Sequence, residues 1–197
     1  MNTQIKNKYS YSTHMRKLIL SQFGAAVLAI MTSMPTMTIS EDNSYGDLLG
    51  IATTVLAVVF FMYLQYTAVW EIAAKDKIAI DGGRMNEDKL RGLKAALLAN
   101  IPTYAFVTLS IVFKAIFLIT DVKGIGLCSD IFYALELFWN YMYHGFLVML
   151  VPKATSWVSL LYFAAFAAFT IPSLLCCYIA YNQGLKVNRI FPEKKKN

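Results

Sequence analysis

The sequence LLGIATTVLAVVFFMYLQYTAVW, residues 48–70, contains no charged side chain. A helix of roughly 20 residues is needed to cross about 30 Å of hydrocarbon, and this stretch is long enough. Lipid offers no hydrogen-bond partner to an exposed backbone group, so a crossing segment of this kind must be helical. The sequence therefore predicts a transmembrane helix here.

Three further apolar runs of this length lie near residues 18–39, 95–119 and 157–181. The chain has 197 residues, of which 57% are hydrophobic and 15% are charged, and this balance argues against a soluble globule. The polar lead before the first run is long and no small-residue cleavage site follows, so we expect a retained helix rather than a signal peptide. We predict an all-α membrane protein in which residues 1–197 form a single helical transmembrane domain.

The positions of lysine and arginine predict the orientation, because these residues favour the cytoplasmic ends of membrane helices. The N-terminal tail, residues 73–94 and residues 182–197 are rich in them, whereas the connections after the first and third runs are not. Both termini are therefore expected in the cytoplasm, with 73–94 as a charged cytoplasmic loop and 182–197 as a basic cytoplasmic tail. The expected location is the cytoplasmic membrane of the cell, with a multi-pass topology.

A fifth apolar stretch, residues 131–151, is interrupted by Glu136, Asn140 and His144 at intervals of four residues. On a helix these side chains share one face. A carboxylate at the bilayer centre costs at least about 2.5 kcal/mol, which argues against a full crossing. We predict four transmembrane helices plus one re-entrant or interfacial helix at 131–151, with the polar face in water; a fifth span is the alternative.

The segment between the second and third runs reads WEIAAKDKIAIDGGRMNEDKLRGLK, residues 70–94. Gly82 and Gly83 predict a tight turn or a short hairpin, since glycine adopts positive φ at little cost. Asn86 suits the N-cap of the next helix. The segment has neither the P-loop pattern nor the dinucleotide-binding pattern, so a turn and a cap account for it without phosphate chemistry.

Acidic and basic residues nearly balance in this loop, so we expect ion pairs within it rather than a dedicated site for anionic lipid. The basic tail is the better candidate for lipid contact. The loop also offers a cytoplasmic contact surface for another protein, formed by Glu71, Lys75, Asp76, Asp81 and Arg84.

Polar residues accompany Pro102 in the third run and Pro172 in the last run. A proline removes one backbone hydrogen bond and can expose a carbonyl, as in the broken helices of transporters. The alternative is ordinary helix packing, in which proline and small polar residues are also common. The candidate polar pocket comprises Asn100, Thr103, Thr170 and Ser173, with Gln65 or Tyr66 contributing from the second run.

Three motifs are similar to those of a known family: WEIAAKDKIAIDGGRM from Trp70, LLANIP from Leu97, and the ending IPSLLCCYIAYNQGLKVNRIFPEKKK from Ile171. They resemble a family of small, uncharacterised multi-spanning membrane proteins of clostridia and related Firmicutes. The likeness runs from about Tyr63 onward, and Ala73 stands where the family pattern often has glycine. The resemblance implies a small membrane protein without naming an activity.

Motifs of catalysis and metal binding are not recognisable in the sequence. Asn140 is a poor metal ligand beside Glu136 and His144, and the three cysteines lack metal spacing. We expect no enzymatic activity, no catalytic, cofactor-binding or metal-binding residues, no cofactor and no nucleic-acid partner.

The expected function is that of a non-enzymatic accessory or assembly subunit, which acts through helix packing and the cytoplasmic loop surface. The alternative is a small transporter or channel subunit with a polar pathway at the proline-broken helices. The expected partners are the lipid bilayer and either a second copy of the chain or another membrane protein.

Overall fold

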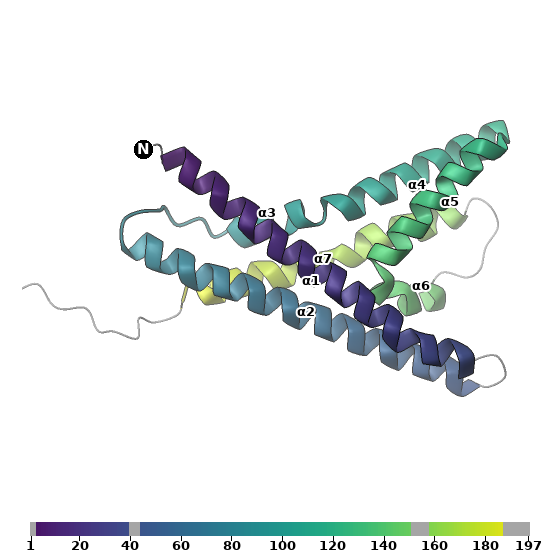
Figure 1. Cartoon of the computed structure of the whole chain (residues 1–197), viewed down its shortest axis with the longest axis horizontal. Helices are drawn as coiled ribbons and strands as arrows, with labels where there is room; N and C mark the ends of the chain where they lie inside the picture. Colours follow the sequence, from purple (N-terminus) through teal and green to yellow (C-terminus); the bar gives the residue numbers. More distant parts are fainter. Residues whose placement is uncertain (1–2, 40–43, 151–157, 187–197) are drawn as a thin grey trace, which may run out of the picture.

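The computed structural model describes residues 3–39, 44–150 and 158–186, and every regular element in these ranges is helical (Figure 1). The elements in chain order are α1 (Thr3–Ile39), α2 (Ser44–Asp81), α3 (Arg91–Ala99), α4 (Ile101–Thr120), α5 (Lys123–Trp139), the 3-10 turn η1 (Tyr141–Tyr143), α6 (His144–Leu150) and α7 (Val158–Gly184).

Four of these helices are long and apolar enough to cross a membrane, which confirms that part of the prediction. Their apolar spans are Met15–Ser33 in α1, Leu48–Asp81 in α2, Ile101–Thr120 in α4 and Ala165–Gly184 in α7. α2 has 38 residues and is therefore about 57 Å long at 1.5 Å per residue. It exceeds the hydrocarbon thickness of about 30 Å, so its ends would reach the headgroup region of a bilayer.

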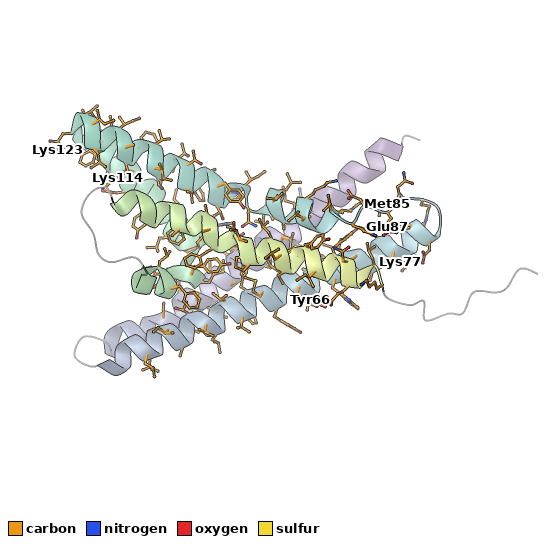
Figure 2. All side chains as sticks on the ribbon, turned by 180° about the vertical axis from the view of Figure 1, so that it is seen from behind. Tyr66, Lys77, Met85, Glu87, Lys114 and Lys123 are labelled. Atoms are coloured by element: carbon orange, nitrogen blue, oxygen red, sulfur yellow. The ribbon has the colours of Figure 1, made fainter. Side chains whose placement is uncertain are left out.

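The helices pack in two arms joined by α7 (Figure 1). α1 packs along α2 and α4 packs along α5, while α7 contacts α2, α3 and α4. The α2–α3 connection and the last turn of α7 lie at one end of the molecule, and the α4–α5 turn lies at the opposite end. Figure 2 shows Lys77, Met85 and Glu87 near the first end and Lys114 and Lys123 near the second.

The third apolar run forms two helices, α3 and α4, with a break at Asn100, where φ is −85° and ψ is 1°. Pro102 occupies the first turn of α4, where its missing N–H leaves no helical hydrogen bond unmade. Pro172 lies inside α7, which continues from Val158 to Gly184. The predicted proline-associated break is therefore confirmed in the third run and wrong for the last run.

The single helix predicted for residues 131–151 is wrong. α5 already begins at Lys123, and it ends before Asn140, whose φ of −111° and ψ of 21° lie outside the helical region. The chain turns through η1, and α6 then heads back toward the end of the molecule that holds the α4–α5 turn (Figure 1). The stretch therefore belongs to two helices separated by a short turn, and α6 packs against α2 rather than along α5.

The charged segment is more helical than the predicted loop at 73–94, because α2 continues to Asp81. Its end is a Schellman motif: the Arg84 N–H donates to the Ala79 carbonyl and the Gly83 N–H to the Ile80 carbonyl, both at 2.9 Å. Gly83 has φ 67°, which explains the glycine at this position. The predicted turn is confirmed, whereas the alternative of a hairpin is wrong.

Two glycines bring helices into close contact with α7 and α2. An added Cβ at Gly92 in α3 would lie 2.4 Å from the Cβ of Tyr181 and 2.8 Å from the carbonyl oxygen of Cys177, both in α7. An added Cβ at Gly184 would lie 2.5 Å from the Cβ of Ala73 in α2. The close approach at Ala73 is therefore made possible by glycine on the opposing helix.

Gly92→Ala is expected to destabilise the fold, because the new methyl group overlaps α7; overpacking of this kind costs roughly 1–3 kcal/mol. Thermal unfolding of the purified protein in detergent measures the effect. The control is Gly24→Ala in α1, where an added Cβ meets nothing within 4 Å and the substitution favours the helix. Equal melting temperatures for the two variants would contradict the packing at Gly92.

Candidate functional site

A buried polar cluster lies where α1, α4 and the α5–η1 break meet. The Nε2 of Gln22 donates a hydrogen bond of 3.2 Å to the Thr103 hydroxyl. The Thr103 hydroxyl in turn donates to the Oδ1 of Asn140 at 3.5 Å. All three side chains are buried. Thr103 is in the first turn of α4 and Asn140 follows α5, so the cluster joins two helix breaks that are distant in the sequence.

Glu136, one turn before Asn140, is the most unusual member of this region. Its relative exposure is 0%, and neither carboxylate oxygen has a hydrogen-bond partner among the described residues. Ser110 of α4 lies near enough to interact with this carboxyl, but its hydroxyl does not reach hydrogen-bond geometry. A buried carboxyl without a partner is energetically costly, which marks Glu136 as a candidate functional residue.

Other polar atoms near the break are also buried without a hydrogen-bond partner in the described part of the chain. They are Oε1 of Gln22, Nε1 of Trp139, the Tyr143 hydroxyl and Nδ1 of His144. Glu136 and Asn140 are buried and His144 is half-buried. The prediction that this polar face stays in water is therefore wrong, because α1 and α4 cover it.

The four residues of the predicted polar pocket are all buried, but they form separate contacts. Thr103 belongs to the cluster just described, and the amide of Asn100 donates to the carbonyl of Ala96 at 2.9 Å. Thr170 and Tyr104 share a hydrogen bond of 3.0 Å. Ser173 donates to Oε1 of Gln65, which also accepts from Cys177 at 3.3 Å, and Tyr66 donates to Gln183.

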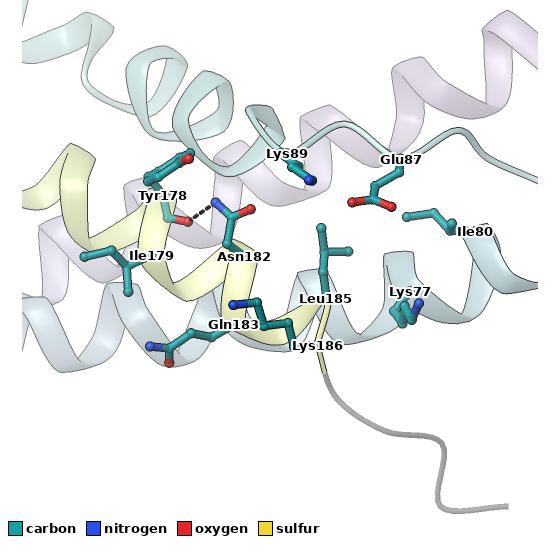
Figure 3. Close-up of a pocket in the computed structure, with 10 residues that line it drawn as sticks. All are labelled: Lys77, Ile80, Glu87, Lys89, Tyr178, Ile179, Asn182, Gln183, Leu185 and Lys186. Atoms are coloured by element: carbon teal, nitrogen blue, oxygen red, sulfur yellow. Dashed lines mark hydrogen bonds between the residues drawn. The ribbon is translucent and has the colours of Figure 1, made fainter. Parts of the chain in front are cut away.

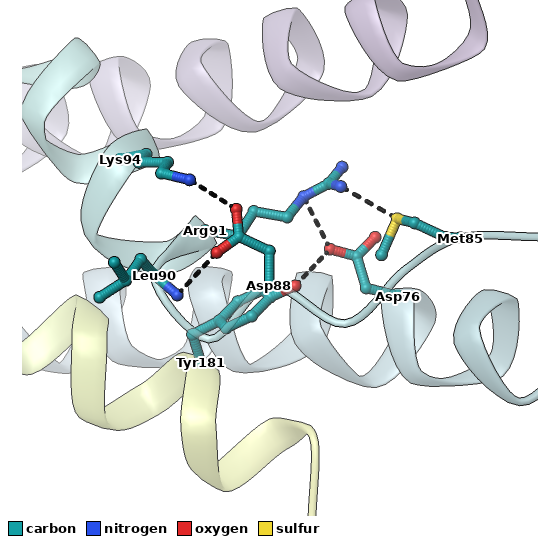
Figure 4. A network of polar contacts seen from close by, with 7 residues as sticks. All are labelled: Asp76, Met85, Asp88, Leu90, Arg91, Lys94 and Tyr181. Carbon is teal, nitrogen blue, oxygen red and sulfur yellow. Dashed lines mark hydrogen bonds and ion pairs between the residues drawn. The ribbon is translucent and has the colours of Figure 1, made fainter. Parts of the chain in front are cut away.

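A second buried network holds the charged segment against the helices (Figure 4). Nε of Arg91 lies 3.1 Å from Oδ2 of Asp76, and the two side chains are only 5% and 9% exposed. The Tyr181 hydroxyl donates to the same oxygen at 3.0 Å, and Nη1 of Arg91 donates to Sδ of Met85 at 2.9 Å. The network thus ties α2, α3 and α7 together in the apolar cluster around Ala73.

The predicted contact surface is only partly available to another protein. Asp76 is buried in the network with Arg91, whereas Glu71, Lys75 and Arg84 are exposed. Glu71 pairs with Lys75 at 2.5 Å and with Lys17 of α1 at 3.1 Å, and Asp81 pairs with Lys77 at 3.0 Å. The expectation of ion pairs within the segment is therefore confirmed, and one of them reaches α1.

Asp88, rather than the predicted Asn86, supports the start of α3. Its carboxylate accepts the Leu90 N–H at 3.0 Å and pairs with Lys94 at 2.7 Å. The hydrogen bond from Lys94 holds the pKa of the Asp88 carboxyl below its usual range. Asn86 is exposed in the segment between α2 and α3, so the predicted cap is wrong.

Among the described residues, no group of three or more His, Cys, Asp or Glu side chains is arranged to hold a metal ion. Compared with known proteins, the chain matches no family model, no curated protein and no solved structure. The resemblance to the clostridial membrane-protein family therefore stays a prediction. The site is defined by its geometry: a buried carboxyl that has no hydrogen-bond partner in the described part of the chain and that lies one turn before the helix break at Asn140.

Asp76→Asn should lower stability by about 3–5 kcal/mol, because it leaves the Arg91 charge buried without its counterion. Thermal unfolding in detergent measures this loss. Asp130→Asn, the same change at an exposed position of α5, is the control and should leave the melting temperature unchanged. A variant at Asp76 as stable as the Asp130 control would show that Arg91 does not depend on this ion pair.

Proposed function

We propose that the chain is a small transporter or channel subunit whose solute pathway passes Glu136. The observation that carries this proposal is the Glu136 carboxyl, which is buried and has no hydrogen-bond partner among the described residues. It lies one helical turn before Asn140, which Thr103 contacts. Ionisable residues inside membrane proteins are costly and commonly mark ion or solute pathways. A carboxyl kept only for packing would be expected to have a partner.

The helix breaks support the same function. Transporter sites often lie where helices are interrupted, because the interruption presents backbone and side-chain polar groups to a solute within the apolar region. The breaks at Asn100 and Asn140 are brought together through Thr103, which follows the first break and contacts Asn140 directly. Polar groups from two interrupted elements therefore meet at Asn140, one helical turn from Glu136.

The proposed topology has four transmembrane helices, with α5 and α6 as a re-entrant hairpin that enters and leaves on the outer side. Both termini and the segment 82–90 are then cytoplasmic. The return of α6 toward the α4–α5 turn supports the hairpin, and the excess of lysine and arginine near the opposite end supports the orientation. A multi-pass protein of the cytoplasmic membrane is the location that follows.

Single cysteines at positions 84, 123 and 153 test this topology in a variant whose native cysteines are replaced by alanine. In intact cells, a membrane-impermeant maleimide should label Lys123→Cys and Lys153→Cys, and it should label Arg84→Cys only after permeabilisation. Lys153 lies outside the described residues but is placed between the fifth and last apolar stretches by the sequence. Labelling of positions 123 and 153 from opposite sides would instead indicate a fifth span.

Flux through the protein is expected to depend on Glu136 and Thr103. Reconstituted vesicles are assayed for movement of protons, potassium, sodium and small neutral amino acids with internal dyes or radiolabels. Glu136→Gln removes the carboxylate while keeping its shape, and Thr103→Val removes the link to Gln22 and Asn140. Each should reduce flux at least tenfold, which corresponds to a loss of about 1.4 kcal/mol.

The control for Thr103→Val is Thr108→Val, an exposed threonine of α4 whose hydroxyl donates to the Tyr104 carbonyl of its own helix. It should leave flux unchanged. Four helices seldom enclose a pathway alone, so the transport proposal includes a second copy of the chain or another membrane protein. Vesicles that pass none of these solutes faster than empty vesicles would overturn the proposal.

An accessory or assembly role is the second candidate, favoured by the exposure of Glu71, Lys75 and Arg84 on one end of the molecule. Under this role the charged surface holds a membrane-protein partner, and charge reversal at Arg84 should reduce the partner recovered by affinity purification from native membranes. Glu136→Gln should then leave the complex intact, which separates the two candidates.

A further inference from the structure

A hollow of about 660 Å³ lies where the end of α2, the segment 82–90 and the end of α7 meet (Figure 3). Three lysines from separate parts of the chain line it: Lys77 of α2, Lys89 before α3, and Lys186 after α7. Asn182 and Gln183 add amide groups that can donate hydrogen bonds. The hollow therefore gathers cationic and hydrogen-bonding groups that are far apart in the sequence.

The charge of the hollow is positive. Among the described residues that line it, Glu87 is the single acidic one, and Asp81 pairs with Lys77 at 3.0 Å from outside the lining. Lys89 and Lys186 are exposed, so their ammonium groups are free to approach an anion. The chain continues beyond Lys186 with further basic residues in the sequence, namely Arg189, Lys194, Lys195 and Lys196. The chemistry favours a phosphate-bearing anion.

One wall of the hollow is apolar and continues along α7. Ile80, Ile179 and Leu185 contribute to the wall, and Tyr178 lies beside them. Farther from the hollow, Leu175 and Ile171 are 55% and 54% exposed, close to the 49% of Ile179. Because residues four apart share one face of a helix, these side chains form an exposed apolar stripe that leads away from the lysines.

The depth of the hollow also suits a lipid headgroup. Lys77 lies 29 residues beyond Leu48, the start of the apolar span of α2, which is about 44 Å along the helix. A bilayer is about 40–45 Å thick when its headgroup regions are included. The lysines would therefore stand at headgroup level, with the stripe on α7 facing the acyl chains.

We propose that this hollow binds one anionic phospholipid, with its phosphate between Lys89 and Lys186 and an acyl chain along the Ile171–Leu175–Ile179 stripe. A free inorganic anion would use the lysines but would leave the apolar stripe unexplained. The lipid site shares no residue with the cluster around Glu136, so the test of the lipid site is independent of the transport proposal.

Native mass spectrometry of the purified full-length chain tests the site with phosphatidylglycerol and phosphatidylcholine of identical acyl chains. Phosphatidylglycerol should be retained preferentially. A lysine near an anionic lipid contributes on the order of 1 kcal/mol, which is about fivefold in affinity. Lys89→Gln combined with Lys186→Gln should therefore reduce retained phosphatidylglycerol by at least fivefold, whereas Glu87→Gln should increase it.

The matched control combines Lys75→Gln with Lys123→Gln, two exposed lysines outside the hollow, and should leave retention unchanged. Thermal unfolding checks that all variants remain folded. An equal loss in the control, equal retention of the two lipids, or displacement of phosphatidylglycerol by excess inorganic phosphate would overturn the proposal. The last result would assign the lysines to a free anion.

Discussion

A backbone N–H or C=O that is buried away from water must find a partner inside the chain, and this requirement explains how the helices of this protein are interrupted. The break between α3 and α4 and the break between α5 and η1 both occur at asparagine. The backbone N–H and the side-chain amide of Asn100 both donate to the Ala96 carbonyl, and those of Asn140 both donate to the Glu136 carbonyl. An asparagine therefore stabilises the preceding turn at the point where the helix stops.

The same requirement bears on the side chains that the breaks bring together. Gln22, Thr103 and Asn140 satisfy part of their hydrogen-bonding capacity through one another. Glu136 does not, although it is equally buried. The local backbone is thus well satisfied while the adjacent carboxyl is not, and this contrast is the observation on which the transport proposal rests.

At the charged end of the molecule, by contrast, the buried charged side chains pair with each other. Asp76 and Arg91 neutralise each other, and Tyr181 adds a hydrogen bond to the same carboxylate. Gly92, next to Arg91, allows α3 to approach α7 closely enough for this network to form. The network therefore fixes how the α2–α3 connection sits on α7, and it has a member in each of the three chain segments that line the basic hollow.

Sequence patterns predicted the four apolar helices because length and lack of charge are local properties. The continuation of α2 to Asp81 was not predictable in this way, because charged residues such as Lys75 are compatible with both a loop and a helix that leaves the apolar region. Nor could the burial of Glu136 be predicted. The four-residue intervals between Glu136, Asn140 and His144 define a polar face but not which helices cover that face.

The contacts between side chains of the candidate site were even less predictable from the sequence. Thr103 and Asn100 were recognisable as polar residues in an apolar run, but nothing in the sequence distinguished Gln22, which joins the site through its contact with Thr103. Gln22 of α1 and Asn140, which follows α5, are joined because Thr103 in the first turn of α4 hydrogen-bonds to both of them. Pairing across helices is a tertiary property, so polar residues inside apolar runs are best treated together, as potential partners, rather than run by run.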